Sequence, residues 1–409
     1  MIGEDRKIGM HIGSGNFALA FFRVIGQFAS SEVIRVSDGG GSHLQMPSLI
    51  HFPQDAAAPE IGRNAKVKWV KFAETVYSPL RLLAEDQHEV QVGQDQIPVD
   101  KLISRLVYEV RDQAGLFGDF SQCSVAYPDY LTTDQLNLLK GAIRSEIPEL
   151  EDRHFVPSSF SVLFDMQLHQ ARYNLGYHKM EFSVPKKVLV LDVGESFTTA
   201  STFEVVEVGQ ELEARYLSKP SSIKVGGRDF DARFAEFLLG LAVAKGNLTE
   251  TDITTELKRQ VQLDAEKCKR DLVEKVDAQV ISTHLPPAKM NDLSVPVRIY
   301  GPSGKKILDE EVTKQQYEDA VFPAVASINE GIPCVLQAVS GTLQLAGLRP
   351  GDVDEVLLVG GMARVHILAQ VLKHTFAKIP REFANPELCA VRGASIYHDM
   401  VSSPLEMRL

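Results

Sequence analysis

The sequence predicts an α/β protein that folds as two lobes, and three observations support this prediction. The chain has 409 residues, which is too long for a single hydrophobic core. Residues 356–364, V-L-L-V-G-G-M-A-R, have the pattern of a buried parallel strand, a glycine turn and the start of a helix. Residues 187–207 repeat the order of strand, glycine turn and strand found at residues 8–24. Each half therefore offers a β-hairpin to a shared cleft, although two unrelated β-meanders would give a similar pattern.

The composition is that of a soluble globular protein and argues against several classes of partner. Hydrophobic residues make up 44% and charged residues 24% of the chain, and the formal net charge is −11. This charge argues against a general nucleic-acid binder or a binder of anionic membranes. The four cysteines are far apart without metal-ligand spacing, so we predict reduced, buried thiols. The N-terminus has no apolar signal segment and no run reaches membrane-spanning length, which predicts a cytoplasmic protein.

The first half of the chain is predicted to contain mostly strands, with two helical regions. Residues 8–24 have a strand, the turn Gly13-Ser14-Gly15 and a second strand. The amides of such a turn suit a phosphate, although an ordinary hairpin has the same pattern. The remaining predictions are short strands at 28–52, a helix at 99–115, a strand at 123–128 that ends in a proline, a capped helix at 133–143 and irregular chain at 166–186.

The second half is predicted to contain longer helices. A glycine pair in K-V-G-G-R-D-F precedes a helix with one apolar side, formed by Phe234, Phe237, Leu238 and Leu241. The other predictions are a charge-rich helix at 255–275, a β region at 278–312, one long helical stretch at 313–345, the strand at 356–359, a helix from Ala363 onward and a short final helix after residue 385.

Eight segments stand out in chain order: I-G-M-H-I-G-S, G-R-N-A-K, V-A-Y-P, V-L-V-L-D-V-G, V-G-G-R-D-F-D, A-E-K-C-K-R-D-L, V-L-L-V-G-G-M-A-R and N-P-E-L-C-A-V-R-G-A. Together and in this order they resemble the nucleotide-binding domain of the 70-kDa heat-shock (DnaK-type) chaperone family, within the actin and sugar-kinase superfamily. The resemblance implies the actin-like fold, with a five-stranded mixed sheet and flanking helices in each lobe and a nucleotide cleft between the lobes. It implies lobe I at residues 1–184, with an inserted subdomain at about 40–117, and lobe II at residues 185–409, with an insert at about 229–311.

The resemblance also implies a binding site for ATP or ADP. Its adenosine side falls on Glu266, Lys269, Arg270, Gly360, Gly361, Met362 and Arg364, and its phosphate side falls on Gly13, Ser14, Gly15, Gly194, Gly226 and Gly227, with Glu387 as a further carboxylate. The spacing of residues 266, 269 and 270 supports this, because the three charged side chains share one helical face. Val273 and Met362 replace small hydroxyl residues of the family, which makes the pocket more apolar.

The catalytic side departs from the family pattern. Lys66 matches the family's lysine, and Asp192 matches a carboxylate that acts in catalysis and near the metal. His11 stands in place of an Asp and Val156 in place of a Glu, and the second glycine turn carries Glu195, Phe197 and Thr199 where the family has Gly, Thr and Asp. Phosphoryl transfer needs Mg²⁺ and carboxylates that hold it and the attacking water, so these losses predict weak or absent ATP hydrolysis and a doubtful Mg²⁺ site.

The interpretation that we favour is a divergent, chaperone-type ATP- or ADP-binding protein that acts as a co-chaperone or partner-binding module. Pro128 is present, but Leu136 stands where the family has the arginine that relays the nucleotide state. The chain ends at Leu409, so we expect no client-binding domain unless the sequence is part of a longer protein. The alternatives are an active ATPase that uses His11 with Lys66, a sugar-kinase-like phosphotransferase, and a scaffold that binds no nucleotide.

Overall fold

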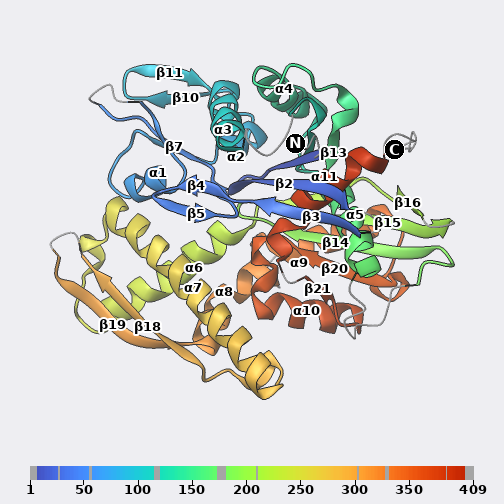
Figure 1. Cartoon of the computed structure of the whole chain (residues 1–409). Coiled ribbons are helices and arrows are strands. Elements are labelled where there is room, and N and C mark those ends of the chain that lie inside the picture. Colours follow the sequence, from blue (N-terminus) through green and yellow to red (C-terminus); the bar gives the residue numbers. More distant parts are fainter. Residues whose placement is uncertain are drawn as a thin grey trace.

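The structure is a computed structural model, and it describes residues 7–25, 28–54, 58–114, 120–172, 181–208, 211–301, 304–327, 331–383 and 385–400. Two mixed sheets form its framework, and helices flank both of them (Figure 1). This architecture agrees with the predicted actin-like α/β class.

The first sheet has the strand order β13-β12-β1-β2-β3, with β6 paired to β2 at the edge of this path. Its strands are β1 (Lys7–Ile12), β2 (Asn16–Ile25), β3 (Phe28–Ile34), β6 (Met46–Pro47), β12 (Ser124–Tyr127) and β13 (Phe155–Pro157). Strand β1 runs antiparallel to β2 and parallel to β12. The glycine turn between β1 and β2 therefore lies at the same edge of the sheet as the carboxyl end of β12.

The second sheet repeats this arrangement with the order β21-β20-β14-β15-β16, and β17 pairs with β15. Its strands are β14 (Lys186–Val193), β15 (Thr198–Val208), β16 (Glu211–Tyr216), β17 (Ser221–Ile223), β20 (Glu355–Val359) and β21 (Arg381–Glu382). Strand β14 runs antiparallel to β15 and parallel to β20, as β1 does to β2 and β12. The two related halves that the repeated hairpin pattern indicated are thus present as two sheets with equivalent strand orders.

The described part of the first half of the chain also contains smaller sheets, β4-β5, β8-β7-β9 and β10-β11, and five α-helices. The strands are β4 (Val36–Asp38), β5 (Gly41–His43), β7 (Leu49–His51), β8 (Glu60–Ile61), β9 (Thr75–Tyr77), β10 (Glu89–Val92) and β11 (Asp95–Pro98). The helices are α1 (Arg63–Lys68), α2 (Pro79–Ala84), α3 (Val99–Ala114), α4 (Thr133–Arg144) and α5 (Ser158–Arg172). The predicted N-cap of the helix at 133 is present, because the Thr132 hydroxyl accepts a hydrogen bond from the Gln135 amide.

Longer helices accompany the second sheet. They are α6 (Gly227–Ala244), α7 (Thr255–Thr283), α8 (Lys314–Val325), α9 (Val335–Leu345), α10 (His366–Phe376) and α11 (Cys389–Met400), and β18 (Ser294–Tyr300) pairs with β19 (Lys306–Thr313). Phe234 and Leu238 on α6 are fully buried, with Phe237 and Leu241 packed beside them, as their spacing predicted.

Three predictions of local structure were wrong in part. Helix α5 continues to Arg172, although irregular chain was expected from residue 166, and its residues 158–166 are buried. Helix α7 continues to Thr283, into the range predicted as β structure. The long helical stretch at 313–345 is two helices, and the break between them follows Pro323 and contains Pro333, which cannot donate a helical hydrogen bond.

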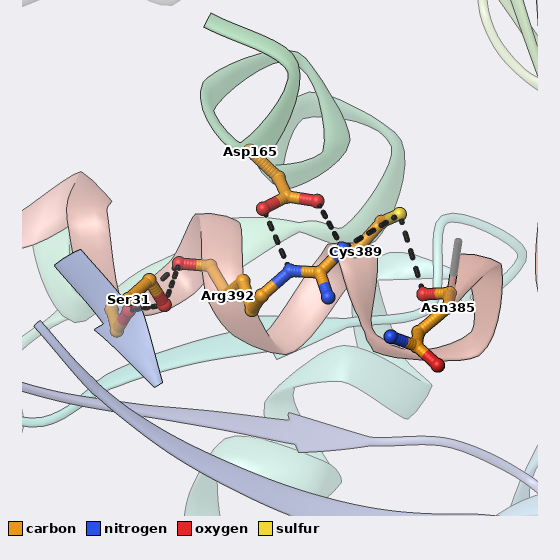
Figure 2. A network of polar contacts seen from close by, with 6 residues as sticks. Ser31, Asp165, Asn385, Cys389 and Arg392 are labelled. Atoms are coloured by element: carbon orange, nitrogen blue, oxygen red, sulfur yellow. Dashed lines mark hydrogen bonds and ion pairs between the residues drawn. The ribbon is translucent and has the colours of Figure 1, made fainter. Parts of the chain in front are cut away.

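The last helix, α11, packs on the first sheet, although the strands that precede it most closely in the chain, β20 and β21, belong to the second sheet. It contacts α5, β1 and β2 (Figure 1). A buried ion pair fixes it there: Arg392 donates hydrogen bonds of 2.9 and 2.8 Å to the two carboxylate oxygens of Asp165 on α5 (Figure 2). The same guanidinium lies 3.5 Å from Sγ of Cys389, and Ser31 of β3 bonds to the Arg392 carbonyl.

The four cysteines are free and buried, as predicted. Within the ranges described above, no helix is both long and apolar enough to cross a membrane.

Candidate functional site

A cavity of about 350 Å³ lies between the two halves of the molecule. This volume is within the range of small-molecule sites. All the predicted site residues except Gly226 line it: Gly13, Ser14, Gly15, Lys66, Asp192, Gly194, Gly227, Glu266, Lys269, Arg270, Gly360, Gly361, Met362, Arg364 and Glu387. The fold thus brings together residues that are up to 374 positions apart, while their individual roles stay predictions.

Two glycine turns face the cavity, one from each sheet. The Gly13 amide donates to the Asn16 carbonyl over 3.0 Å, and the Gly194 amide donates to the Phe197 carbonyl over the same distance. Gly226 lies beneath the second turn, because a Cβ atom at this position would approach the Glu195 carbonyl carbon and oxygen to 2.5 Å. Its lack of a side chain therefore serves close backbone packing.

Glu195 projects from the second glycine turn toward the first. A Cβ atom added to Gly15 would lie only 2.6 Å from Cβ of Glu195. The hydroxyl of Tyr77 donates a hydrogen bond to Oε1 of Glu195, across the cavity from β9. Burial raises the pKa of Glu195, while Tyr77 and the charges of Arg228 and Lys66 oppose the shift.

Lys66 and Glu266, predicted for opposite sides of the site, form an ion pair. The Lys66 ammonium lies 2.8 Å from Oε1 and 2.7 Å from Oε2 of Glu266, and both side chains are mostly buried. Burial opposes ionisation of Glu266, but Lys66 and Lys269 hold its pKa below the ordinary value. The predicted catalytic lysine is thus held by a residue of α7.

Lys269 is also paired inside the protein. Its ammonium lies 2.8 Å from Oδ1 and 2.9 Å from Oδ2 of Asp231 on α6. Sδ of Met362 lies 3.5 Å from the same ammonium, and a Cβ atom on Gly227 would approach that sulfur to 3.0 Å. Met362 therefore fills the space between Lys269 and the α6 N-terminus with an apolar group.

The cavity is also lined by a planar guanidinium, that of Arg364. Arg364, in the turn after β20, donates a hydrogen bond of 3.0 Å to Asp277 of α7, which holds its guanidinium in place. His366 lies 3.3 Å from the other oxygen of that carboxylate. Gly361 has open space where a Cβ atom would stand. A planar guanidinium beside an open backbone suits an aromatic base.

The cavity floor contains Asp192, Asp129 and His11. Burial, reinforced by the charge of Asp129, raises the pKa of Asp192 to about 7. Asp129 accepts hydrogen bonds from the Ser159 hydroxyl and, over 3.0 Å, from the Tyr216 hydroxyl. Burial lowers the pKa of His11 to about 4, so its imidazole is neutral at pH 7.

The described residues at one end of the cavity fit a nucleoside, whereas those at the other end do not form a metal site. In the described residues, Nδ1 of His11 and Oε2 of Glu387 are buried without a hydrogen-bond partner, and both residues line the cavity, so both atoms are available to a bound molecule. The held guanidinium of Arg364 and the carboxylate of Glu266 fit a nucleoside. Across the same described ranges, no group of three His, Cys, Asp or Glu side chains is arranged to hold a metal ion. Val156, in place of a family carboxylate, is fully buried.

Several cavity residues were not predicted as site residues. Tyr77, Trp69, Asp129, Tyr130, Arg228 and Asp231 all line it. Arg228 and Asp231 belong to the quoted motif V-G-G-R-D-F-D, so closer attention to that motif would have found them. Tyr130 stacks on Phe197 with ring centroids 4.2 Å apart, a contact between the two halves that no local pattern indicates.

Comparison with known proteins agrees with the fold. The profile of the Hsp70 protein family matches residues 173–408, which is more than half of the chain. The chaperone protein DnaK of Burkholderia cenocepacia (strain HI2424) is 25% identical over 285 residues, which cover 69% of this chain and 38% of that protein. The DnaK of Burkholderia cepacia is 27% identical over 218 residues, which cover 53% of this chain and 30% of that protein. The alignments thus span between 30% and 38% of the length of these relatives. The family match over more than half of the sequence, on two sheets of equivalent strand order, shows that the chain belongs to the Hsp70 family.

Proposed function

We propose that the cavity binds an adenine nucleotide and that the protein hydrolyses ATP slowly or not at all. The observation that carries this proposal is that one cavity contains both glycine turns, Glu266 and Arg270 of α7, and the anchored guanidinium of Arg364. The adenine ring would lie against Arg364, and the ribose would face Glu266. The glycine turns offer backbone amides to phosphate oxygens.

Slow hydrolysis follows from the residues around the phosphate end. Magnesium prefers oxygen ligands, and His11 is a neutral imidazole where the family has a carboxylate. Phe197 stacks on Tyr130 instead of offering a hydroxyl. A bound Mg²⁺ would neutralise phosphate charge, and Asp192 is the carboxylate in the cavity best matched to it. Each lost charge contact typically costs several kcal/mol of transition-state stabilisation, so several losses together predict very slow turnover.

Nucleotide binding would then act on a protein partner through the conformation of the cleft. The partner is proposed to be a component of a chaperone system, because the chain belongs to the Hsp70 family. Leu136, in place of the relay arginine, packs against the apolar core of the first lobe. Any nucleotide signal would therefore reach the partner through the lobe contacts and not through this position.

Isothermal titration calorimetry tests the proposal directly. ATP and ADP are titrated with and without Mg²⁺ into the wild type and into Glu266→Ala/Arg270→Ala, with Lys258→Ala/Lys267→Ala as a control of exposed residues on the same helix. Micromolar binding that is independent of Mg²⁺, lost in the first variant and kept in the second supports the proposal. Strong Mg²⁺ dependence with turnover that Lys66→Ala abolishes would favour an active ATPase. Absence of binding would favour a scaffold.

A further inference from the structure

Glu195 occupies the space between the two glycine turns. Its Cβ lies against Gly15, at a distance that leaves no room for a side chain on that glycine. The carboxylate continues across the cavity to the hydroxyl of Tyr77, and the Ser196 hydroxyl lies 3.3 Å from Oε2. An anionic tail that entered between the turns would meet this carboxylate before it reached the turn amides.

The cations around Glu195 are arranged to hold this carboxylate. The charges of Arg228 and Lys66 act on it, and both lower its pKa against the effect of burial. Arg228 lies 4.4 Å from the ring centroid of Tyr77, the residue that donates to Glu195. Tyr77 and Arg228 come from different lobes, so the tyrosine that holds the carboxylate is itself in contact with the second lobe.

Three of the cations that line the cavity already have carboxylate partners. Lys66 is paired with Glu266, Lys269 with Asp231, and Arg364 with Asp277. His11, at the first turn, is neutral at pH 7. Besides these three, Arg228 and Arg270 line the cavity. Each additional phosphate would bring negative charge toward Glu195, and the three paired cations could offset it only by leaving their carboxylates.

We propose that Glu195 is a built-in anion in the place of the terminal phosphates, and that it makes the cleft select adenosine and AMP over ADP, and ADP over ATP. This inference rests on the proposed nucleotide site, and it restricts the preferred ligands of that site to adenine compounds with few phosphates. Tyr77 acts as a positioning residue that holds the Glu195 carboxylate between the turns.

The test is a titration of adenosine, AMP, ADP and ATP into the wild type, Glu195→Gln and Glu195→Gly, at fixed ionic strength and in EDTA. Glu195→Gln keeps the shape and removes the charge, and Glu195→Gly removes the side chain. Glu274→Gln is the matched control, because Glu274 lines the same cavity from an exposed position on α7 and its change removes the same charge. Thermal unfolding of each variant confirms that it is folded.

We expect ATP to bind the wild type at least tenfold more weakly than adenosine does. Both Glu195 variants should strengthen ATP binding about tenfold or more and leave adenosine binding nearly unchanged. Tyr77→Phe should give a smaller gain of the same sign, because it frees the carboxylate without removing it. Equal affinities for the four ligands in the wild type, or a gain no larger than that of Glu274→Gln, would overturn the inference while the nucleotide site stands. Failure of all four ligands to bind both the wild type and Glu195→Gly would overturn the nucleotide site itself.

Discussion

Arg259 donates a hydrogen bond of 3.1 Å from Nη1 to the backbone carbonyl of Trp69, and its guanidinium lies 5.4 Å from the centroid of the indole ring. Arg228 lies over the same ring at the same distance. The buried indole of the first lobe is thus in contact with cations from α6 and α7 of the second. Two cation–π contacts and a hydrogen bond at one residue make this a strong point of attachment between the lobes.

Replacement of Arg259 should loosen this attachment. We expect Arg259→Ala to lower the free energy of unfolding by about 1–2 kcal/mol, since it removes a cation–π contact and leaves a carbonyl without its donor. Hydrogen–deuterium exchange should rise in α1 and in the N-terminal half of α7. Arg298→Ala, at an exposed arginine of β18, is the control and should change unfolding by less than about 0.5 kcal/mol. Equal effects of the two changes would contradict the attachment.

Substitution in the buried pair of Asp165 and Arg392 should lower the free energy of unfolding much more than Arg259→Ala does. Asp165 is fully buried, so Arg392→Met would remove the cation that this buried carboxylate faces, and the free energy of unfolding should fall by about 3–5 kcal/mol. The double change Asp165→Leu/Arg392→Met removes both charges and should be less destabilising than Arg392→Met alone. Urea denaturation measures both. A double variant less stable than the single one would show that the charges themselves stabilise α11.

The histidine at the first glycine turn predicts a loss of stability in mild acid. Burial lowers the pKa of His11 from 6.5 to about 4, so the unfolded chain accepts a proton that the folded protein does not. Stability due to this group is therefore complete above pH 6.5 and is lost as the pH falls toward 4. We expect His11→Gln to reduce the loss of unfolding free energy between pH 7 and pH 4.5 by about 1–2 kcal/mol. His88→Gln, at an exposed histidine, is the control.

A double-mutant cycle tests the packing of Glu195 on the first turn. Gly15→Ala places a methyl group 2.6 Å from Cβ of Glu195, and this overpacking should cost about 1–3 kcal/mol. In a Glu195→Gly background the clash is gone, and the cost of Gly15→Ala should fall below about 0.5 kcal/mol. Chemical denaturation of the four proteins gives the coupling. Additive effects would place Glu195 away from Gly15 in solution.

The sequence predicted the sheet hairpins because these depend on local patterns, and all but one of the site residues that the resemblance implied line one cavity. The apolar strand at 356–359, its glycine pair and the turn at Gly13 are contiguous signals, and each is found where it was expected. The charged helix at 255–275 was also correct, because its spacing puts the charges on one face. The resemblance to the heat-shock family then implied that these segments form one nucleotide site.

The contacts between lobes could not be predicted in this way. Tyr77 meets Glu195 across 118 positions, and Lys66 meets Glu266 across 200, so no window of sequence contains both partners. Lys269 was expected to face the ligand, but its pairing with Asp231 depends on how α6 and α7 pack. The break between α8 and α9 was missed because apolar spacing continues through it and obscured the prolines.

The position of α11 has a consequence for the order in which the protein can be made. The helix covers strands of the first sheet, but the ribosome produces it after all the strands of the second sheet. Until residues 389–400 emerge, the contacts that Arg392 makes with Asp165 and Ser31 cannot form, and the apolar face that α11 covers is exposed. The N-terminal lobe is therefore completed last, and a nascent chain that holds only this lobe would expose a surface that chaperones and proteases recognise.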